Sequence, residues 1–187
     1  MKDWFMAWPE ELKEDVITEL LSLYEPSNSK KAQVGHSDFK ENTKIRSSQV
    51  IGIDILNPNH NKISKILDPY VLLANREFFG FELNRISEFQ IAKYSEGDFF
   101  TEHMDMYLSN PSTRKISITV QLSDPADYVG GDFKFTKDLE FADGAQEIVR
   151  KKGTIIAFPS FLYHQITPIT EGVRYSLVGW YEGSNWR

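Results

Sequence analysis

The apolar residues near the start of the chain recur at the spacing of an amphipathic helix. Between Trp8 and Tyr24 they lie three or four positions apart, and Pro9 followed by Glu10 and Glu11 suits a first helical turn. The apolar positions are Leu12, Val16, Ile17, Leu20, Leu21 and Tyr24. We therefore predict a helix over residues 8–24 with one face packed against a sheet, and a second helix over residues 63–79.

A different pattern, of short β-branched and aromatic runs, predicts strands. Residues 46–56 are rich in valine and isoleucine and end at the turn-forming Asn57-Pro58-Asn59. Beyond Ile86, strands are predicted over residues 89–94, 99–106, 115–123, 132–136, 154–158, 163–166 and 173–181. Glycine, proline and aspartate separate several of these runs, as is typical of an antiparallel sandwich or barrel.

Length and composition favour one domain over residues 1–187. A chain of 187 residues with 41% apolar and 13% aromatic residues is large enough to bury a hydrophobic core. We expect a mainly β fold with supporting helices. Residues 1–85 would supply the helical support, with an added strand near residues 46–56, and residues 86–187 would supply the β core.

Two polar segments outside the predicted strands are candidates for contact with a substrate. Residues 25–42 contain Pro26, Asn28 and Gly35, which predicts a long mobile loop that could form a lid. Residues 138–144 form a second polar loop. We expect a substrate groove to involve one or both of them.

Composition and charge exclude several kinds of protein. No stretch approaches the roughly 18 apolar residues of a membrane span, and the first residues lack a secretory pattern, so we expect a soluble, cytoplasmic protein without a membrane partner. A net charge of -6 argues against nucleic acid as a partner, and Lys30-Lys31 and Arg150-Lys151-Lys152 are interpreted as solvated loop charges. Because cysteine is absent, any metal site must use nitrogen and oxygen ligands.

Two histidines and an aspartate have the spacing of a metal site. His103 and Asp105 are two residues apart on a predicted strand, so both side chains would point into one cavity while Met104 and Met106 face away. With His164 they could occupy one face of an octahedral metal and leave the opposite face open, as non-haem Fe(II) oxygenases require. The His-x-Asp triplet alone is weak evidence, because a chain of this composition contains one by chance about half the time.

An arginine downstream of the second histidine strengthens this interpretation. If residues 167–172 form the turn of a hairpin symmetric about Ile169, His164 and Arg174 face each other with their Cβ atoms about 5 Å apart. The same face would carry Leu162, Ile166, Ser176, Val178 and Trp180. An arginine beside an open metal position offers a planar fork for a carboxylate.

Several ordered motifs resemble one enzyme family over about residues 46–186. The run from Tyr94 through Gly97 to His103 and Asp105 resembles the Tyr-x-x-Gly-x5-His-x-Asp motif of Fe(II)/2-oxoglutarate dioxygenases of the prolyl 4-hydroxylase type, above all bacterial and phage-like members. The similarity continues through Arg114-Lys-Ile-Ser117-Ile-Thr119, Tyr128-Val-Gly130-Gly131-Asp132-Phe133, Lys152-Gly-Thr154, Phe158-Pro-Ser160, His164-Gln-Ile-Thr-Pro168 and Gly172-Val-Arg174.

The resemblance implies a fold, cofactors and residue roles. The fold would be a double-stranded β-helix, or jelly roll, with N-terminal helices packed on one sheet. His103, Asp105 and His164 would bind Fe(II), and Arg174, assisted by Ser176, would bind the distal carboxylate of the cosubstrate 2-oxoglutarate. Dioxygen is the second cosubstrate, with ascorbate as a candidate reductant. Tyr94 would lie near the cosubstrate, Arg114 and Trp180 would contact a peptidyl proline, and Arg46-Ser47-Ser48 weakly resembles a further substrate-contacting segment.

Two positions depart from the family pattern. Gln121 stands where many prolyl hydroxylases place a tyrosine that binds the cosubstrate carboxylate, although its amide could also donate. Phe100 stands where a substrate-contacting tyrosine is common. Structural roles compete with functional ones at other positions. Core packing is an alternative for Trp180, Tyr94, Ser176 and Gln121, and a solvated strand end is an alternative for Arg114. Gly130-Gly131 is interpreted as a tight turn with positive φ, and His36 and His60 as solvent-facing loop residues.

Three functional classes follow. The preferred one is hydroxylation of a prolyl residue in a peptide or protein, with release of succinate and CO2. The second is the same chemistry on a small molecule or on another residue type. The third is a catalytically silent jelly-roll binding module, against which the intact set of metal ligands and Arg174 argues.

Overall fold

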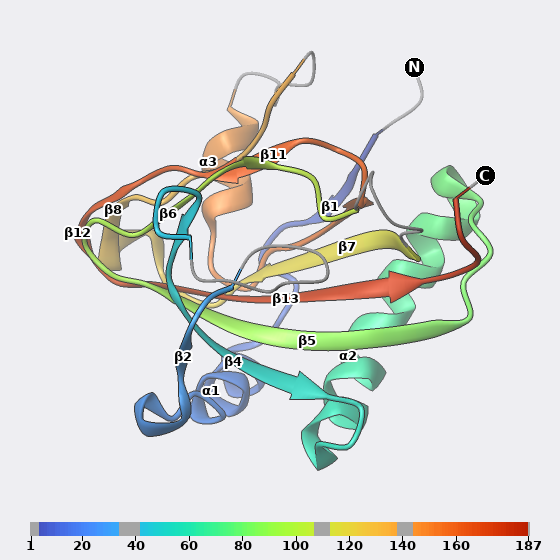
Figure 1. Cartoon of the computed structure of the whole chain (residues 1–187), viewed down its shortest axis with the longest axis horizontal. Helices are drawn as coiled ribbons and strands as arrows, with labels where there is room; N and C mark the ends of the chain where they lie inside the picture. Colours follow the sequence, from blue (N-terminus) through green and yellow to red (C-terminus); the bar gives the residue numbers. More distant parts are fainter. Residues whose placement is uncertain (1–3, 34–41, 107–112, 138–143, 187) are drawn as a thin grey trace.

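Two antiparallel sheets face each other in the computed structural model (Figure 1), which describes residues 4–33, 42–106, 113–137 and 144–186. The larger sheet has the order β1 (Met6–Trp8), β10 (Ile155–Pro159), β7 (Arg114–Gln121), β13 (Arg174–Glu182), β5 (Arg85–Tyr94), β4 (Gln49–Asp54) and β2 (Lys30–Lys31). The smaller sheet has the order β3 (Arg46–Ser47), β6 (Phe99–His103), β11 (His164–Ile166) and β9 (Phe133–Phe135). A separate pair joins β8 (Tyr128–Gly130) to β12 (Ile169–Gly172).

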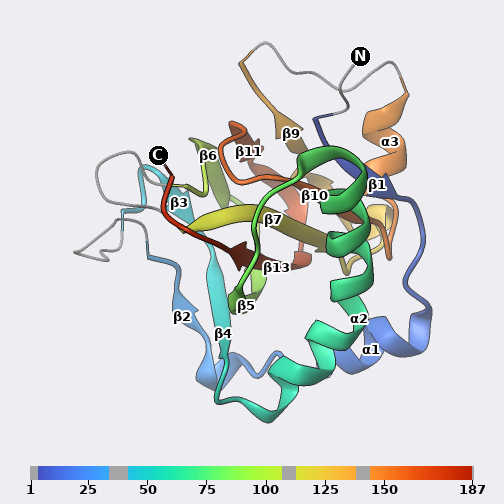
Figure 2. The ribbon, with the colours of Figure 1, turned by 90° about the vertical axis from the view of Figure 1, so that its right-hand side faces the viewer.

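Helices cover one face of the larger sheet, opposite the smaller sheet (Figure 2). They are α1 (Glu14–Ser22) and α2 (Pro58–Ala74), which continues into a π-helical turn over Asn75–Phe79, while the short α3 (Ala145–Arg150) precedes β10. The buried residues of this layer include Ile17, Leu20, Leu67, Val71, Ile116, Ile118 and Leu177. The mainly β fold with helices packed on one sheet is therefore confirmed. None of the helices described is both long and apolar enough to cross a bilayer.

Strand alternation explains why the other face of the larger sheet can hold a polar site. In β7, Ile116, Ile118 and Val120 pack towards the helices, so Ser117 and Thr119 point towards the smaller sheet. Nearer β9, apolar residues fill the space between the sheets: Ala92, Phe133, Phe135, Ile156, Phe158 and Ile166. The polar positions of β7 and β13 thus enter an otherwise apolar interior.

The first helix is shorter than predicted. Trp8, the first residue of the predicted helix, instead ends β1, which pairs with β10, and the helix runs only from Glu14 to Ser22. Glu10 has a φ of 53°, and the Leu12 amide donates to the Gly153 carbonyl, so the segment is held to the sheet as an irregular connection. The pairing of β1 with β10, which is a non-local contact, outweighs the local helical pattern at Trp8.

The second helix and its histidine also differ from the prediction. The helix begins at Pro58, five residues early, because the Asn57 side chain accepts a hydrogen bond from the Asn59 amide and caps it. His60 therefore lies inside α2, where it is 6% exposed and packs against Phe89, so its assignment to a solvent-facing loop is wrong. His36 lies outside the described residues.

The hairpin predicted about Ile169 does not form. Residues 169–172 form β12, which pairs with β8, and the chain crosses to the larger sheet before β13. His164 pairs instead with His103 and Phe135, and Arg174 pairs with Tyr94. The two residues still face the same interior, but from opposite sheets.

The remaining segments need smaller corrections. Residues 46–56 divide between β3 and β4, which belong to different sheets, and the strand predicted over 99–106 ends at His103. Arg150 is no solvated loop charge, because its guanidinium forms an ion pair with Asp132 and donates to the Gly130 carbonyl. The predicted loop over 25–42 is not loop throughout, because Pro26–Asn28 form a 3-10 turn and Lys30–Lys31 form β2. Residues 34–41 of this loop and residues 138–143 of the second loop lie outside the described residues.

Candidate metal centre

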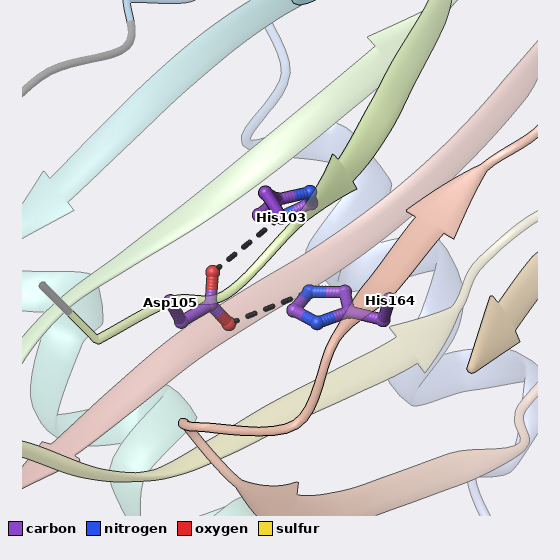
Figure 3. Close-up of side chains that lie close together, drawn as sticks. All are labelled: His103, Asp105 and His164. Atoms are coloured by element: carbon purple, nitrogen blue, oxygen red, sulfur yellow. Dashed lines mark ion pairs between the residues drawn. The ribbon is translucent and has the colours of Figure 1, made fainter. Parts of the chain in front are cut away.

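His103, Asp105 and His164 converge at one end of the space between the sheets (Figure 3). The Nε2 atom of His103 lies 3.7 Å from Asp105 Oδ1, and that of His164 lies 3.6 Å from Asp105 Oδ2. All three ligand atoms lie within 4.8 Å of one another. His103 comes from the end of β6 and His164 from the start of β11, and the pairing of these two strands brings the imidazoles together.

Backbone carbonyls fix which nitrogen each histidine presents. The His103 Nδ1 atom donates to the Thr101 carbonyl over 2.8 Å, and the His164 Nδ1 atom donates to the Leu162 carbonyl over 2.9 Å. Each carbonyl can only accept, so Nδ1 carries the proton and Nε2 presents its lone pair to the centre. Both histidines are therefore oriented as metal ligands.

Two serines that the sequence interpretation missed hold the carboxylate. Asp105 lies beyond the end of β6, and its Oδ2 atom accepts a 2.6 Å hydrogen bond from Ser117 Oγ, which lies 2.9 Å from Ser160 Oγ. The Asp105 amide donates to the Ser160 carbonyl. The alternation of β7 places Ser117 on the interior face, a signal that the sequence carries.

Electrostatics keep the ligands in the forms that bind a cation. Burial and the neighbouring His164 lower the pKa of His103 to about 3, against the opposing effect of Asp105. Burial would raise the pKa of Asp105, but His164, His103 and Arg114 outweigh it and hold the pKa at about 2. A neutral imidazole and an ionised carboxylate at neutral pH need lose no proton to a metal.

Arg174 lies fully buried on the interior face of β13. Its Nη2 atom donates to Gln121 Oε1 over 2.8 Å and its Nη1 atom to Ser176 Oγ over 3.4 Å, while Nε has no partner. Among the residues that the structure describes, no carboxylate forms an ion pair with it. A buried cation without an anion is costly, so this environment favours a bound anionic group.

The other predicted cosubstrate residues surround Arg174. Tyr94 is its neighbour across the β5–β13 ladder, with the guanidinium 5.6 Å from the ring centre, and Gln121 pairs with Ser176 between β7 and β13. The amide oxygen of Gln121 therefore accepts from Arg174, and its amide nitrogen remains to donate to another acceptor. Gly130 and Gly131 have φ values of 76° and 63°, which confirms the turn interpretation.

The predicted substrate residues lie at the other end of β13. Trp180 is buried, its Nε1 atom has no partner, and the Arg114 guanidinium stacks 3.8 Å above its ring. Arg114 is also 3.9 Å from Glu88, so it is neither a free strand end nor fully solvated. Phe100 stacks on His103, and Arg46 covers Phe100. One pocket is lined by Arg46, Tyr94, Phe100, the three ligand residues, Ser117, Thr119, Ser176, Val178 and Trp180.

Comparison with known proteins accounts for this arrangement. The model of the 2OG-Fe(II) oxygenase superfamily matches residues 89–182, which include all three ligand residues and Arg174. The chain belongs to the 2OG-Fe(II) oxygenase superfamily. The superfamily implies Fe(II), 2-oxoglutarate and dioxygen as the reacting groups.

Curated relatives and solved structures agree with this assignment. A PKHD-type hydroxylase from Synechococcus sp. is 36% identical over 100 residues, which are 54% of this chain and 43% of the relative, so the chain matches less than half the length of that relative. A Pseudomonas putida prolyl-4-hydroxylase superposes with a TM-score of 0.72 at 21% identity, covering 95% of this chain and 91% of that one. A Trichoplax adhaerens prolyl hydroxylase, solved with a hypoxia inducible factor peptide, superposes with a TM-score of 0.74 at 16% identity, covering 96% and 84%. These likenesses confirm the double-stranded β-helix fold.

The residues of this chain fit the groups that the superfamily implies. Two Nε2 lone pairs and a carboxylate are a donor set for Fe(II) with open positions. The guanidinium of Arg174, whose Nε atom has no hydrogen-bond partner among the described residues, fits a carboxylate at the distal end of 2-oxoglutarate. Both features face the same interior, from strands β6, β11 and β13.

Proposed function

We propose that this chain is an Fe(II)- and 2-oxoglutarate-dependent dioxygenase that hydroxylates a C–H bond, with a prolyl residue of a peptide or protein as the substrate. Fe(II) with 2-oxoglutarate and dioxygen supplies the oxidant, so that one oxygen atom enters the substrate and the other enters succinate as CO2 is released. Ascorbate is proposed as the reductant that maintains Fe(II). His103, Asp105 and His164 would hold the metal.

One observation carries the proposal: Arg174 is fully buried, has no carboxylate partner among the described residues, and faces the interior that holds the candidate metal ligands. A silent binding module gains nothing from an unpaired buried charge, which costs stability. In the proposed enzyme, 2-oxoglutarate would supply the missing anion. Ser176 and Gln121 would hold the guanidinium, and Tyr94 would cover it.

Trp180 and Arg114 support a peptide substrate. The indole N–H of Trp180 is buried without a partner in a pocket that includes the ligand residues, so it could donate to a substrate carbonyl. Arg114 holds the indole ring from its other side. The PKHD-type hydroxylase and the prolyl hydroxylases with the same fold support proline as the target.

The test is anaerobic loading with Fe(II) and 2-oxoglutarate, followed by oxygen and measurement of succinate with a pool of proline-rich peptides. We expect peptide-stimulated succinate and a gain of one oxygen on proline. His164→Ala and Arg174→Gln should abolish both. Lys65→Ala is the matched control, because Lys65 is exposed on α2, away from the site, and should leave both unchanged.

Each other result selects an alternative. Succinate without peptide stimulation, or oxygen transfer to a small molecule alone, would leave the oxygenase and refute the prolyl substrate. Binding of neither Fe(II) nor 2-oxoglutarate would favour the silent module.

A further inference from the structure

The orientation of Asp105 depends on a directed chain of hydroxyl groups. An ionised carboxylate can only accept hydrogen bonds, so the 2.6 Å contact means that Ser117 Oγ donates to Asp105 Oδ2. Since the Ser117 proton is then committed, the 2.9 Å contact with Ser160 requires the Ser160 hydroxyl to donate to Ser117. The chemistry thus fixes the direction of both bonds.

The backbone of Ser160 holds the same aspartate from another side. The Ser160 carbonyl accepts from the amides of Asp105 and Met106, each over 3.0 Å. The Ser160 amide donates to the Lys115 carbonyl of β7, and the residue is fully buried. Asp105, which no strand holds, is therefore anchored to the larger sheet through the connection between β10 and β11.

The number of aspartate oxygens on a metal sets how many other ligands fit. An octahedral ion with three one-atom protein ligands keeps three positions, two for a chelating 2-oxo acid and one for dioxygen. A carboxylate that binds through both oxygens would leave only two. The cosubstrate and dioxygen could then not bind together.

We propose that Ser117, oriented by Ser160, is a positioning residue that keeps Asp105 a one-oxygen metal ligand. Ser117 donates to Oδ2, which also lies 3.6 Å from His164 Nε2, and leaves Oδ1, 3.7 Å from His103 Nε2, for the metal. The proposal rests on the proposed function and refines it. Ser117 would not bind the metal itself, but its hydrogen bond to Asp105 would keep the third metal position open.

The test separates metal affinity from cosubstrate affinity in Ser117→Ala, Ser117→Thr and Ser160→Ala. Co(II) alone is titrated first, and 2-oxoglutarate is then titrated into the metal-saturated protein without oxygen, with the Fe(II)–2-oxoglutarate charge-transfer absorption as a second readout. In Ser117→Ala we expect Co(II) affinity within about threefold of the wild type, because the freed Oδ2 atom of Asp105 forms a second bond to the metal. We expect the affinity for 2-oxoglutarate to be about tenfold or more lower, because that second bond takes one of the metal positions it needs. Ser117→Thr should restore both the affinity and the absorption.

Ser160→Ala keeps the backbone anchor and removes only the orienting hydroxyl. It should lower 2-oxoglutarate affinity by about threefold, and it keeps the proposal testable if Ser117→Ala does not fold. Ser64→Ala is the matched control, because the Ser64 hydroxyl is buried in α2 and bonds only to His60.

Three results would overturn the proposal. They are unchanged affinities in Ser117→Ala and Ser160→Ala, an equal loss of Co(II) and 2-oxoglutarate binding in Ser117→Ala, or failure of Ser117→Thr to restore cosubstrate binding. A wild-type protein that binds neither probe contradicts the proposed function itself, so the two failures are distinguishable.

Discussion

The phenyl ring of Phe100 lies flat on the imidazole of His103, with ring centres 3.5 Å apart and planes 11° from parallel. The Arg46 guanidinium lies 4.7 Å from the centre of the Phe100 ring. This stack and the hydrogen bond to Thr101 together fix the plane of the His103 ring, one of the proposed metal ligands. Phe100, which departs from the family pattern, therefore helps to hold the imidazole of His103 in place.

Phe100→Leu should weaken metal binding while the protein stays folded. Leucine keeps apolar volume but loses the stacked ring, so we expect Co(II) affinity to fall several-fold and the free energy of unfolding to fall by about 1 kcal/mol. Phe100→Tyr should bind Co(II) like the wild type. Phe99→Leu, on the opposite face of β6, is the control, and an equal effect on Co(II) binding there would contradict a specific role for the stack.

Arg174→Met should make the ligand-free protein more stable. Methionine has a similar length and removes a buried charge that has no anionic partner, so we expect unfolding in urea to cost about 1 kcal/mol more than in the wild type. The variant should lose the stabilisation that 2-oxoglutarate gives the wild-type protein. A less stable ligand-free variant would mean that the bonds to Gln121 and Ser176 outweigh the cost of the buried charge.

Gly131→Ala should disturb Arg174 through its aliphatic stem. An added Cβ atom would lie 2.3 Å from Ile169 Cδ1 and 3.1 Å from Arg174 Cδ, at a φ of 63°. Gly80→Ala has a similar φ of 69° but open space around the new atom, so it measures the backbone strain alone, about 1 kcal/mol. We expect Gly131→Ala to lose more stability than this control in urea unfolding, and to lose 2-oxoglutarate affinity in calorimetry, which Gly80→Ala should retain.

His60 should make the fold less stable at mildly acidic pH. Burial lowers its pKa below the usual 6.5, although Asp54 and Asp68 partly oppose the shift. Below pH 6.5 the unfolded chain therefore binds a proton that the folded chain resists, and stability falls as the pH falls. His103 shifts in the same direction, so the effect of His60 is the difference between the wild type and His60→Gln in urea unfolding at pH 7.5 and 5.5. A parallel fall in both proteins would contradict the assignment.

The sequence predicted what depends on short-range pattern. The alternation along β13 placed Ser176 and Trp180 on one face, and the spacing of His103 and Asp105 indicated a shared cavity, which the structure contains. The partner of each strand depends on contacts far apart in the chain. The Ile169 hairpin failed for this reason, because residues 169–172 pair instead with β8, which lies far earlier in the chain.

The missed site residues have the same origin. Ser117 and Ser160 are 43 residues apart and meet Asp105 only after β7, β10 and β6 have been placed in two sheets. A serine on a strand carries no sequence mark of the carboxylate that it will bind. His60 was misplaced because an asparagine cap moved the start of α2 in front of it.

The position of Arg174 on β13, a strand in the middle of the larger sheet, also bears on which dicarboxylate could bind. Arg174, Ser176, Val178 and Trp180 occupy alternate positions of β13, so the strand spaces the cosubstrate end from the substrate end by about 20 Å. β13 is hydrogen-bonded on both sides, to β5 and β7. A shift of β13 by one residue would turn these side chains out of the interior. The register of the sheet therefore fixes the position of Arg174, and the length of 2-oxo diacid that could reach from a bound metal to this arginine would depend on that register.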